Sequence, residues 1–571
     1  MNTLKFKILS ILLVLFVTGC NDSDFLKEDL KDRFTTENAY LNVSQFKTGT
    51  NQLYRQARAF YNSGDGVRDW IKNGYGTDVI PSNSREEKVH SFWNNLTPDT
   101  QFPNDWYNRN YEMIKNCNEL LLQTENENIE WVSETQKLEI QGEIRFFRGF
   151  SYRNLAILFG GVPIVLDPIT SPKLDFKRAT RLETYTVAME DLLFASQNMA
   201  ITTDQPGRVV RAAADHFLSE VYISLGDETK DKSMYQKAIA AATRVIDGSD
   251  GDYELMRTRF GTRKNEEGKD VNWDLFRMGN QNYNTGNKES IWTIQFEKDV
   301  AGGMNTYDRP LFERAFWPNF WNSSKFGFSG PARDWTGRGV ASIKPNNYFK
   351  YNVWKNSETD TRNAPYNIER TYYAPKVIVD GKQTDRDTVY VTNVTLANGT
   401  EIEVSLHPGD EIKKEWLTSR VDTLTLFYPR IWKFGTDKHI NGTPDNGYVR
   451  DAYVARLPET YLLRAEAYMK SDQNDKAASD INTVRLRSNA LPINASDINI
   501  DFILDERARE LYGEEWRTFT LARLSLIYER TKKYGWPTDA AAVEKHHNLF
   551  PIPQNAINAN LEHPLEQNPG Y

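Results

Sequence analysis

An aromatic-rich segment in the middle of the chain is the first place to look for ligand chemistry. Six of the 14 tryptophans in the 571 residues fall within residues 273–354, about three times their average density. Sugars present C–H faces and a rim of hydroxyl groups, so oligosaccharide sites pair flat aromatic rings with hydrogen-bonding side chains. Residues 316–322 (Phe-Trp-Pro-Asn-Phe-Trp-Asn) have this mixture, and nearby Gly and Pro favour an exposed loop. We predict that Trp317, Trp321 and Trp335 contact a ligand.

Catalytic and metal chemistry have little support in the sequence. The seven histidines include no His-Glu-x-x-His pattern, and the adjacent His546 and His547 cannot share one helical face as metal ligands. Among 78 acidic residues, two carboxylates at glycosidase spacing mean nothing until a fold brings them together. Cys117 lies in an amphipathic helical stretch, which favours a buried free thiol over a nucleophile. The sequence therefore predicts no catalytic residue, no metal site and no cofactor.

The N-terminal residues predict an export signal. Two lysines precede the apolar run 8–17, which is too short to cross a hydrocarbon core of ~30 Å as a helix. The ending Val17-Thr18-Gly19-Cys20 resembles the lipobox of bacterial lipoproteins, in which cleavage after residues 1–19 leaves Cys20 as a lipid-carrying N-terminus. The alternative is a plain secreted protein in which Cys20 lies near the cleavage site by chance.

An acidic tract follows Cys20 and predicts a solvated tether over residues 20–36. It resembles the signal that some Gram-negative bacteria use to send lipoproteins to the cell surface. We therefore expect a lipid-anchored protein on the outer surface of the outer membrane.

The overall composition narrows the function further. The net charge of −8 argues against a general nucleic-acid binder, which needs a basic surface to displace counterions. Two cysteines exclude a disulfide scaffold and a multi-cysteine metal cluster.

Helical patterns must position these candidates. Residues 37–61 and 100–123 are predicted helices, and Ser133-Glu134-Thr135-Gln136 fits a capping box at the start of another. That helix must stop at Gly160-Gly161, before Pro163. Trp106, at helical spacing from neighbouring tyrosines, and Trp292, in an alternating stretch, are predicted to pack in the core.

An internal repeat predicts how the helices pair. Residues 219–223 (Ser-Glu-Val-Tyr-Ile) recur as 465–469 (Ala-Glu-Ala-Tyr-Met), and each copy is followed by Lys-Ala and then by a valine seven residues further on. Small residues and a tyrosine on a first helix, with an Ala-led second helix, are typical of tetratricopeptide-type pairs. The alternative is two unrelated amphipathic helix pairs.

The segment between the two copies has a different character. Residues 251–454 are rich in Gly, Asn, Pro and aromatic residues, and residues 377–426 alternate like strands with turns at three X-Gly pairs. We predict a mostly α fold: tetratricopeptide-like helix pairs over about 37–250 and 455–535, with a loop- and strand-containing insertion over about 251–454. Such an insertion is where a solenoid usually keeps its binding surface.

Several motifs together resemble the SusD-like (SusD/RagB) family of outer-membrane nutrient-binding lipoproteins. They cover almost the whole mature chain, although Thr520 stands where the family usually has an acidic residue. The motifs are Gly-Glu-Ile-Arg-Phe-Phe-Arg at 142–148, Leu-Phe-Gly-Gly-Val-Pro at 158–163, Leu-Pro-Glu-Thr-Tyr-Leu-Leu-Arg-Ala-Glu-Ala at 457–467, Glu-Arg-Ala-Arg-Glu-Leu at 506–511, and the closing segments 549–553 and 568–571.

The resemblance implies one α-rich domain over residues 37–571 that captures glycans for a SusC-like TonB-dependent transporter. Loops between the first helix pairs contribute to the glycan site in that family, which makes Asp78 and Trp93 predicted contacts. Arg68 and Tyr283 complete the predicted ligand-binding set.

We therefore expect a non-catalytic protein that binds oligosaccharides and delivers them to such a transporter. A peptide-capturing, RagB-like lipoprotein is the first alternative. A surface glycosidase and a tetratricopeptide interaction scaffold without a small ligand are the others.

Overall fold

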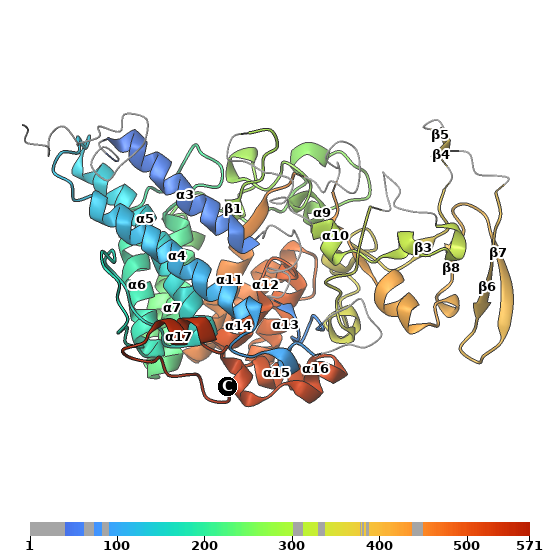
Figure 1. The fold of residues 1–571 in the computed structure, drawn as a ribbon. Coiled ribbons are helices and arrows are strands. Elements are labelled where there is room, and N and C mark those ends of the chain that lie inside the picture. Colours follow the sequence, from blue (N-terminus) through green and yellow to red (C-terminus); the bar gives the residue numbers. More distant parts are fainter. Residues whose placement is uncertain are drawn as a thin grey trace, which may run out of the picture.

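Helices that pack in sequence order form the first half of the protein (Figure 1). The computed structural model describes residues 40, 42–61, 74–82, 91–300, 312–328, 337–376, 378–379, 382–383, 388–436 and 449–571. Each helix of this block packs against the next one along the chain. The helices are α3 (Val43–Tyr61), α4 (Gln101–Gln123), α5 (Glu134–Phe159), α6 (Arg181–Asn198), α7 (Arg211–Thr229) and α8 (Lys232–Ile246).

A second block of helices closes the chain and continues the same stack. Its first helix, α11, packs against both α8 and α12, so the second copy of the repeat lies directly on the first. Ser219 on α7, with Ala465 and Ala467 on α11, is fully buried, and such small side chains let helices approach closely. The helices are α11 (Leu457–Lys470), α12 (Asn474–Arg487), α13 (Ile500–Leu511), α14 (Arg517–Arg523), α15 (Ile527–Tyr534), α16 (Pro537–Ala542) and α17 (Gln554–Ala559). The predicted mostly α fold of helix pairs is confirmed.

Local signals set the ends of α5. The Ser133 hydroxyl accepts a hydrogen bond from the Gln136 backbone N–H at 3.2 Å, as predicted, but the Gln136 side chain accepts from Val132 rather than from Ser133. The helix ends at Gly160, whose φ of +74° lies outside the helical range. Glycine suits this position because any side chain would be strained at such a φ. The predicted helix 37–61 begins only at Val43, and residues 37–39 lie outside the described part of the chain.

Short strands and turns make up the insertion. The strands pair two by two and antiparallel: β1 with β10, β2 with β9, β3 with β8, β4 with β5, and β6 with β7. The elements are α9 (Val271–Leu275), β1 (Ser290–Ile294), α10 (Phe312–Phe316), β2 (Ile368–Glu369), β3 (Tyr372–Tyr373), β4 (Ile378–Val379), β5 (Lys382–Gln383), β6 (Tyr390–Thr395), β7 (Glu401–Leu406), β8 (Glu411–Ile412), β9 (Arg430–Ile431) and β10 (Ala452–Arg456).

The predicted alternation over residues 377–426 corresponds in part to the β6–β7 hairpin, which turns at Asn398-Gly399. This hairpin lies at the edge of the molecule in Figure 1, away from the helices. It contributes Val394 and Val404 to a separate small core that also contains Phe320 and Trp416. The insertion therefore carries a hydrophobic core of its own.

Aromatic side chains fill the main core between the helices. Trp106 stacks on Phe60 with ring centres 5.0 Å apart, and Trp292 meets Phe146 and Phe150 edge-on. Both tryptophans are about 1 % exposed, which confirms the prediction that they pack in the core.

Buried ion pairs join the second helix block to the insertion. Glu510 on α13 contacts Arg362 at 2.9 Å and Arg456 at 3.1 Å, and it also pairs with Arg487. Burial alone would raise the pKa of Glu510, but the guanidinium groups of Arg487, Arg456 and Arg362 hold it well below its usual range. The Glu-Arg-rich motif at 506–511 is thus part of the packing of the fold.

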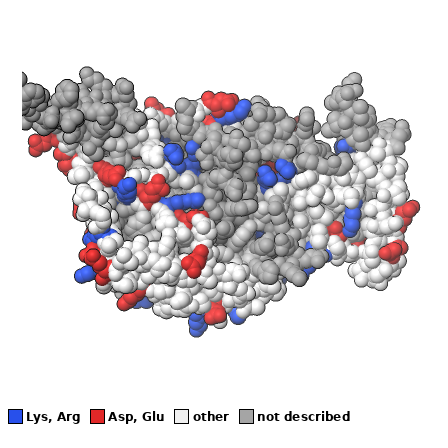
Figure 2. Space-filling model, viewed as in Figure 1, with Lys and Arg blue, Asp and Glu red and all other residues white. Residues whose placement is uncertain are grey.

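Charged side chains of both signs are interspersed over the described surface in Figure 2. In the part of the chain that the structure describes, no helix is long and apolar enough to cross a membrane.

Candidate functional site

An open cleft of about 550 Å³ lies in the insertion, where three stretches of chain meet. Its volume is in the range of small-molecule sites in proteins, roughly 300–1,000 Å³. One wall precedes and includes α9, the second spans β2 and β3, and the third follows β9. The lining residues are Arg263, Glu266, Lys269, Trp273, Pro365, Tyr366, Glu369, Arg370, Thr371, Tyr373, Trp432 and Thr436.

Backbone pairing holds these walls together. Glu369 in β2 lies opposite Arg430 in β9, and the Trp432 N–H donates to the Asn367 carbonyl at 2.9 Å just beyond the pair. Asp270 caps α9 by accepting from the Trp273 N–H at 3.0 Å, and it also accepts from the Asn367 side chain at 3.2 Å. The three stretches are therefore fixed to one another by hydrogen bonds.

Aromatic rings line the cleft at different depths. Trp273 is only 4 % exposed, and its ring centre lies 5.5 Å from that of the half-buried Trp432. Tyr366 is half-buried as well, whereas Tyr373 is 46 % exposed. The rings thus run from a buried tryptophan to an exposed tyrosine.

Carboxylates fix the two tryptophans. Glu266 accepts from the Trp273 indole N–H at 3.1 Å and pairs with Arg263 at 2.7 Å. Glu369 accepts from the Trp432 indole N–H at 3.0 Å and pairs with Arg430 behind the cleft. Each carboxylate is thus engaged in holding an aromatic ring.

The tyrosines keep their hydrogen-bonding capacity. Burial, and to a smaller extent Asp270, raises the pKa of Tyr366 to about 12, so its phenol is neutral at physiological pH. Neither the Tyr366 nor the Tyr373 hydroxyl hydrogen-bonds to any protein group among the described residues. The cleft therefore offers aromatic faces next to phenol groups that can donate to and accept from a ligand.

A second cavity in the described part of the chain is similar in size but less polar. A groove of about 490 Å³ between α4 and the segment around α17 has mostly apolar walls, such as Tyr107, Val165 and Leu565.

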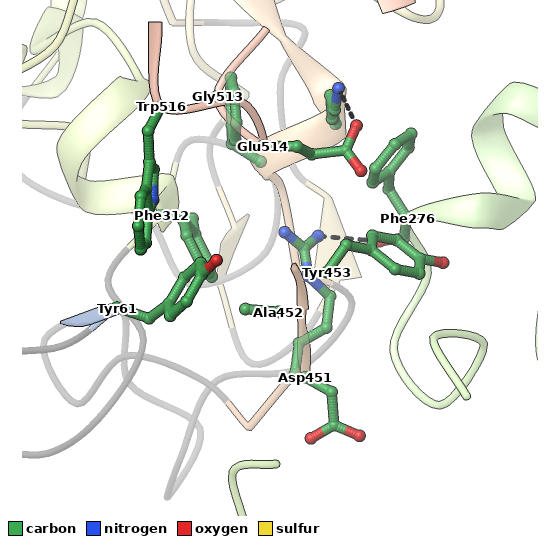
Figure 3. Close-up of a pocket in the computed structure, with 12 residues that line it drawn as sticks. Tyr61, Phe276, Phe312, Asp451, Ala452, Tyr453, Gly513, Glu514 and Trp516 are labelled. Carbon is green, nitrogen blue, oxygen red and sulfur yellow. Dashed lines mark hydrogen bonds and ion pairs between the residues drawn. The ribbon is translucent and has the colours of Figure 1, made fainter. Parts of the chain in front are cut away.

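The pocket in Figure 3 has a volume of only about 30 Å³. The rings of Tyr61, Phe312 and Trp516 lie on one side of it, and those of Tyr453 and Phe276 on the other. This volume admits a water molecule or two and no sugar ring.

Two family models match most of the chain. The model described as "SusD family" matches residues 288–571, and the model described as "Starch-binding associating with outer membrane" matches residues 24–223. The chain belongs to the SusD family. This agrees with the resemblance in the sequence motifs.

Similar proteins extend this assignment. The starch-binding protein SusD of Bacteroides thetaiotaomicron is 36 % identical over 126 residues, which are 21 % of this chain and only 22 % of that protein. A SusD-like protein of Formosa agariphila is 21 % identical over 96 % of both chains.

Solved structures share the fold of this SusD-family protein. A laminarin-binding SusD-like protein has a TM-score of 0.63 at 20 % identity, with 93 % of this chain and all of the other covered. Surface glycan-binding protein A of Bacteroides fluxus has a TM-score of 0.63 at 19 % identity, covering 93 % of this chain and 99 % of the other. At such identities the likeness establishes the fold.

The predicted contacts Asp78, Trp93 and Trp317 need correction, because this SusD-family protein buries all three. Asp78 is fully buried, and its carboxylate is held by two arginines. Trp93 is 2 % exposed and donates its indole N–H to the Gly76 carbonyl at 2.9 Å. Trp317 is also 2 % exposed, and it donates to a backbone carbonyl at 2.9 Å. Their side chains serve packing and present no surface to a ligand.

Trp321 and Tyr283 are partly exposed but lie outside the cleft lining. Trp321 donates its indole N–H to the Gly339 carbonyl at 2.6 Å. Tyr283 borders a separate cavity of about 60 Å³, and its hydroxyl donates to the Asp252 carbonyl at 3.0 Å. The structure therefore does not bring these two predicted residues together with the cleft.

Three further predicted residues, Arg68, Trp335 and Cys20, lie outside the described residues.

The cleft contains residues that the sequence analysis missed. Tyr366, Arg370 and Tyr373 form an aromatic and basic stretch, and Trp432 lies 59 residues beyond it, directly after the two-residue strand β9. The close spacing of these tyrosines and this arginine within residues 251–454 is a sequence pattern that could have marked them as candidate ligand contacts. That they line the same cleft as Trp273 could not be predicted, because this proximity depends on the pairing of β2 with β9.

Proposed function

We propose that this SusD-family protein captures oligosaccharides at the cell surface in the cleft and delivers them to a SusC-like TonB-dependent transporter. The observation that carries the proposal is the cleft itself: Tyr366, Tyr373 and Trp432 offer ring faces beside unengaged phenol hydroxyls. Rings of this kind stack on the C–H faces of sugars, while hydroxyl groups hydrogen-bond to the sugar rim.

The comparisons support the same proposal. SusD of Bacteroides thetaiotaomicron is named as starch-binding, one structural neighbour is named as laminarin-binding, and another is named as a surface glycan-binding protein. None of these names specifies the sugar for this chain.

The proposal includes the cellular location of the protein and the way it is anchored. We infer that residues 1–19 are removed, that Cys20 carries the lipid and that the acidic residues up to 36 tether the fold to the outer membrane. In this arrangement the protein needs no spanning helix, since acyl chains anchor it by ~0.8 kcal/mol per buried CH₂.

Affinity electrophoresis tests glycan capture. The wild-type protein should be retarded in gels containing one or more of a broad panel of polysaccharides. Tyr366→Ala and Tyr373→Ala should each weaken the binding about tenfold, since an aromatic platform contributes about 1.4 kcal/mol, near the upper end for such ring contacts. The matched control is Tyr468→Ala, because Tyr468 is a half-buried tyrosine on α11, away from the cleft.

Other outcomes would favour the alternatives. Absence of retardation across the panel, with oligopeptides recovered from the purified protein, would replace glycan by peptide capture. Release of reducing ends would establish a glycosidase. Failure to co-purify a SusC-like transporter from native outer membranes would contradict the delivery step.

A further inference from the structure

The charges in the cleft are unevenly satisfied. Its two carboxylates already have guanidinium partners: Glu266 pairs with Arg263 at 2.7 Å, and Glu369 pairs with Arg430. The lining also contains Lys269 and Arg370, and neither forms an ion pair with a carboxylate in the described part of the chain. The cleft thus has two cationic groups in excess, although the whole chain has a net charge of −8.

Lys269 is held over aromatic rings. Its Nζ lies 4.3 Å from the ring centre of Trp273 and 5.2 Å from that of Tyr366. These rings attract a cation but accept no conventional hydrogen bond, and within the described structure no acceptor hydrogen-bonds this ammonium. Its three donors therefore remain available to a ligand.

The surroundings of Lys269 favour an anionic partner. Burial lowers the pKa of Lys269; Glu266 opposes this shift, and the nearby guanidinium groups of Arg263, Arg277 and Arg259 add to it. A negative charge placed beside Nζ would offset both the lost hydration and the repulsion from these cations.

Arg370 presents a second cationic group on the wall that carries Tyr366. Its Nη2 donates to the Asn363 side chain at 2.7 Å, and its Nη1 contacts the Ile368 carbonyl at 3.3 Å. These contacts orient the guanidinium group, yet Arg370 remains exposed to solvent. An oriented guanidinium group matches carboxylate and sulfate oxygens in geometry.

We propose that the cleft selects acidic sugars, with Lys269 and Arg370 binding the carboxylates of uronic acids or the oxygens of sulfate esters. This inference rests on the proposed function and specifies its ligand class. Neutral glycans can stack on the same rings, but they leave both cations without a counter-charge. Long-range repulsion by a chain of net charge −8 would disfavour acidic glycans, so a locally cationic cleft is needed to bind them.

Isothermal titration calorimetry with matched ligand pairs tests the proposal on the full chain. One pair is an oligogalacturonide and its methyl ester, and the other is a sulfated galactan oligosaccharide and its desulfated form. At least one acidic member should bind about tenfold tighter than its neutral partner, and raising the salt concentration should reduce this preference. The first pair reports carboxylate recognition, and the second reports sulfate recognition.

Charge-removing variants locate the effect. Lys269→Gln and Arg370→Gln should each lower the affinity for the preferred acidic ligand about tenfold and should lower the affinity for its neutral partner much less, so that the preference for the acidic ligand shrinks. The control is Lys264→Gln, because Lys264 is exposed, close in sequence and not part of the cleft lining.

The outcomes separate the two proposals. Equal affinity for both members of each pair, with binding still about tenfold weaker in Tyr373→Ala, would overturn acidic selection and leave glycan capture intact. A preference for acid that Lys269→Gln and Arg370→Gln do not change would also overturn it. No binding of any glycan, acidic or neutral, would overturn the proposed function and this inference together.

Discussion

Asp78 accepts two hydrogen bonds from the guanidinium group of Arg517, at 2.9 and 2.7 Å, although 439 residues separate them in sequence. Arg530 adds a third contact at 2.8 Å, and all three side chains are buried. Burial alone would raise the pKa of Asp78, but the two arginines lower it to about 2. This cluster fastens residues 74–82 to the C-terminal helices.

Replacing Asp78 by Asn should therefore destabilise the fold. The change removes the carboxylate that both buried guanidinium groups share and leaves Arg517 paired with Glu515, and Arg530 with Asp501 and Asp505. Because part of the counter-charge remains, we expect the free energy of unfolding to fall by roughly 3 kcal/mol, the lower end for a broken buried ion pair. Urea denaturation measures the loss. Asp252→Asn is the control, because the carboxylate of Asp252 pairs with Lys288 at 2.9 Å while 85 % exposed. That change should cost less than about 1 kcal/mol, and similar losses in both variants would contradict the assigned role of Asp78.

His216 should make stability depend on pH. Burial, with smaller contributions from the nearby Arg507 and Arg153, lowers the pKa of His216 to about 3, so the folded protein holds its ring neutral. The unfolded chain takes up a proton below about pH 6.5. The contribution of His216 is thus fully present above pH 6.5 and is lost as the pH falls towards 3, at roughly 1.4 kcal/mol per pH unit.

The measurement compares unfolding at pH 7 and pH 5 in the wild type and in His216→Gln. The drop in unfolding free energy between these pH values should be about 2 kcal/mol smaller in the variant, since glutamine does not titrate. Equal drops in both proteins would show that His216 does not bury a neutral ring.

Local patterns in the sequence predict the helices well. Ser133 and Gly160 mark the ends of α5 because caps and left-handed glycines act within a few residues. The repeat predicts the stacking of α11 on α8 for a similar reason, since small buried residues at fixed spacing define a packing face.

Burial of individual side chains could not be predicted in this way. Trp317 stands among Gly, Pro and Asn, yet Ile431 and Trp432, more than 100 residues later, enclose it. The composition around a residue says which chemistry it could perform, whereas distant pairings decide whether it reaches solvent. The cleft could not be predicted for the same reason, because three separate stretches of chain form it.

Lipidation at Cys20 is testable on cells. Wild-type protein should incorporate labelled palmitate and remain with the membrane fraction, whereas Cys20→Ser should do neither, because the lipid is the proposed anchor. Cys117 provides an internal control, since its thiol is buried in α4 and burial raises its pKa, so Cys117→Ser should leave labelling unchanged. Membrane retention of unlabelled Cys20→Ser protein would point to a different anchor.

Trp93 and Tyr373 should respond to truncation in opposite ways. Trp93 packs against His547 and Phe550, with ring centres 5.2 and 6.5 Å away, so Trp93→Ala opens a core cavity and should cost roughly 3–5 kcal/mol of unfolding free energy. Tyr373 is 46 % exposed, so Tyr373→Ala should change stability by about 0.5 kcal/mol or less. Glycan affinity should show the reverse pattern: about tenfold weaker in Tyr373→Ala and unchanged in folded Trp93→Ala. Thermal unfolding and calorimetric titration of the same samples separate the two effects. If Trp93→Ala stays folded but no longer binds glycan, the glycan site would lie at the N-terminal loops around Asp78 and Trp93 and not in the cleft.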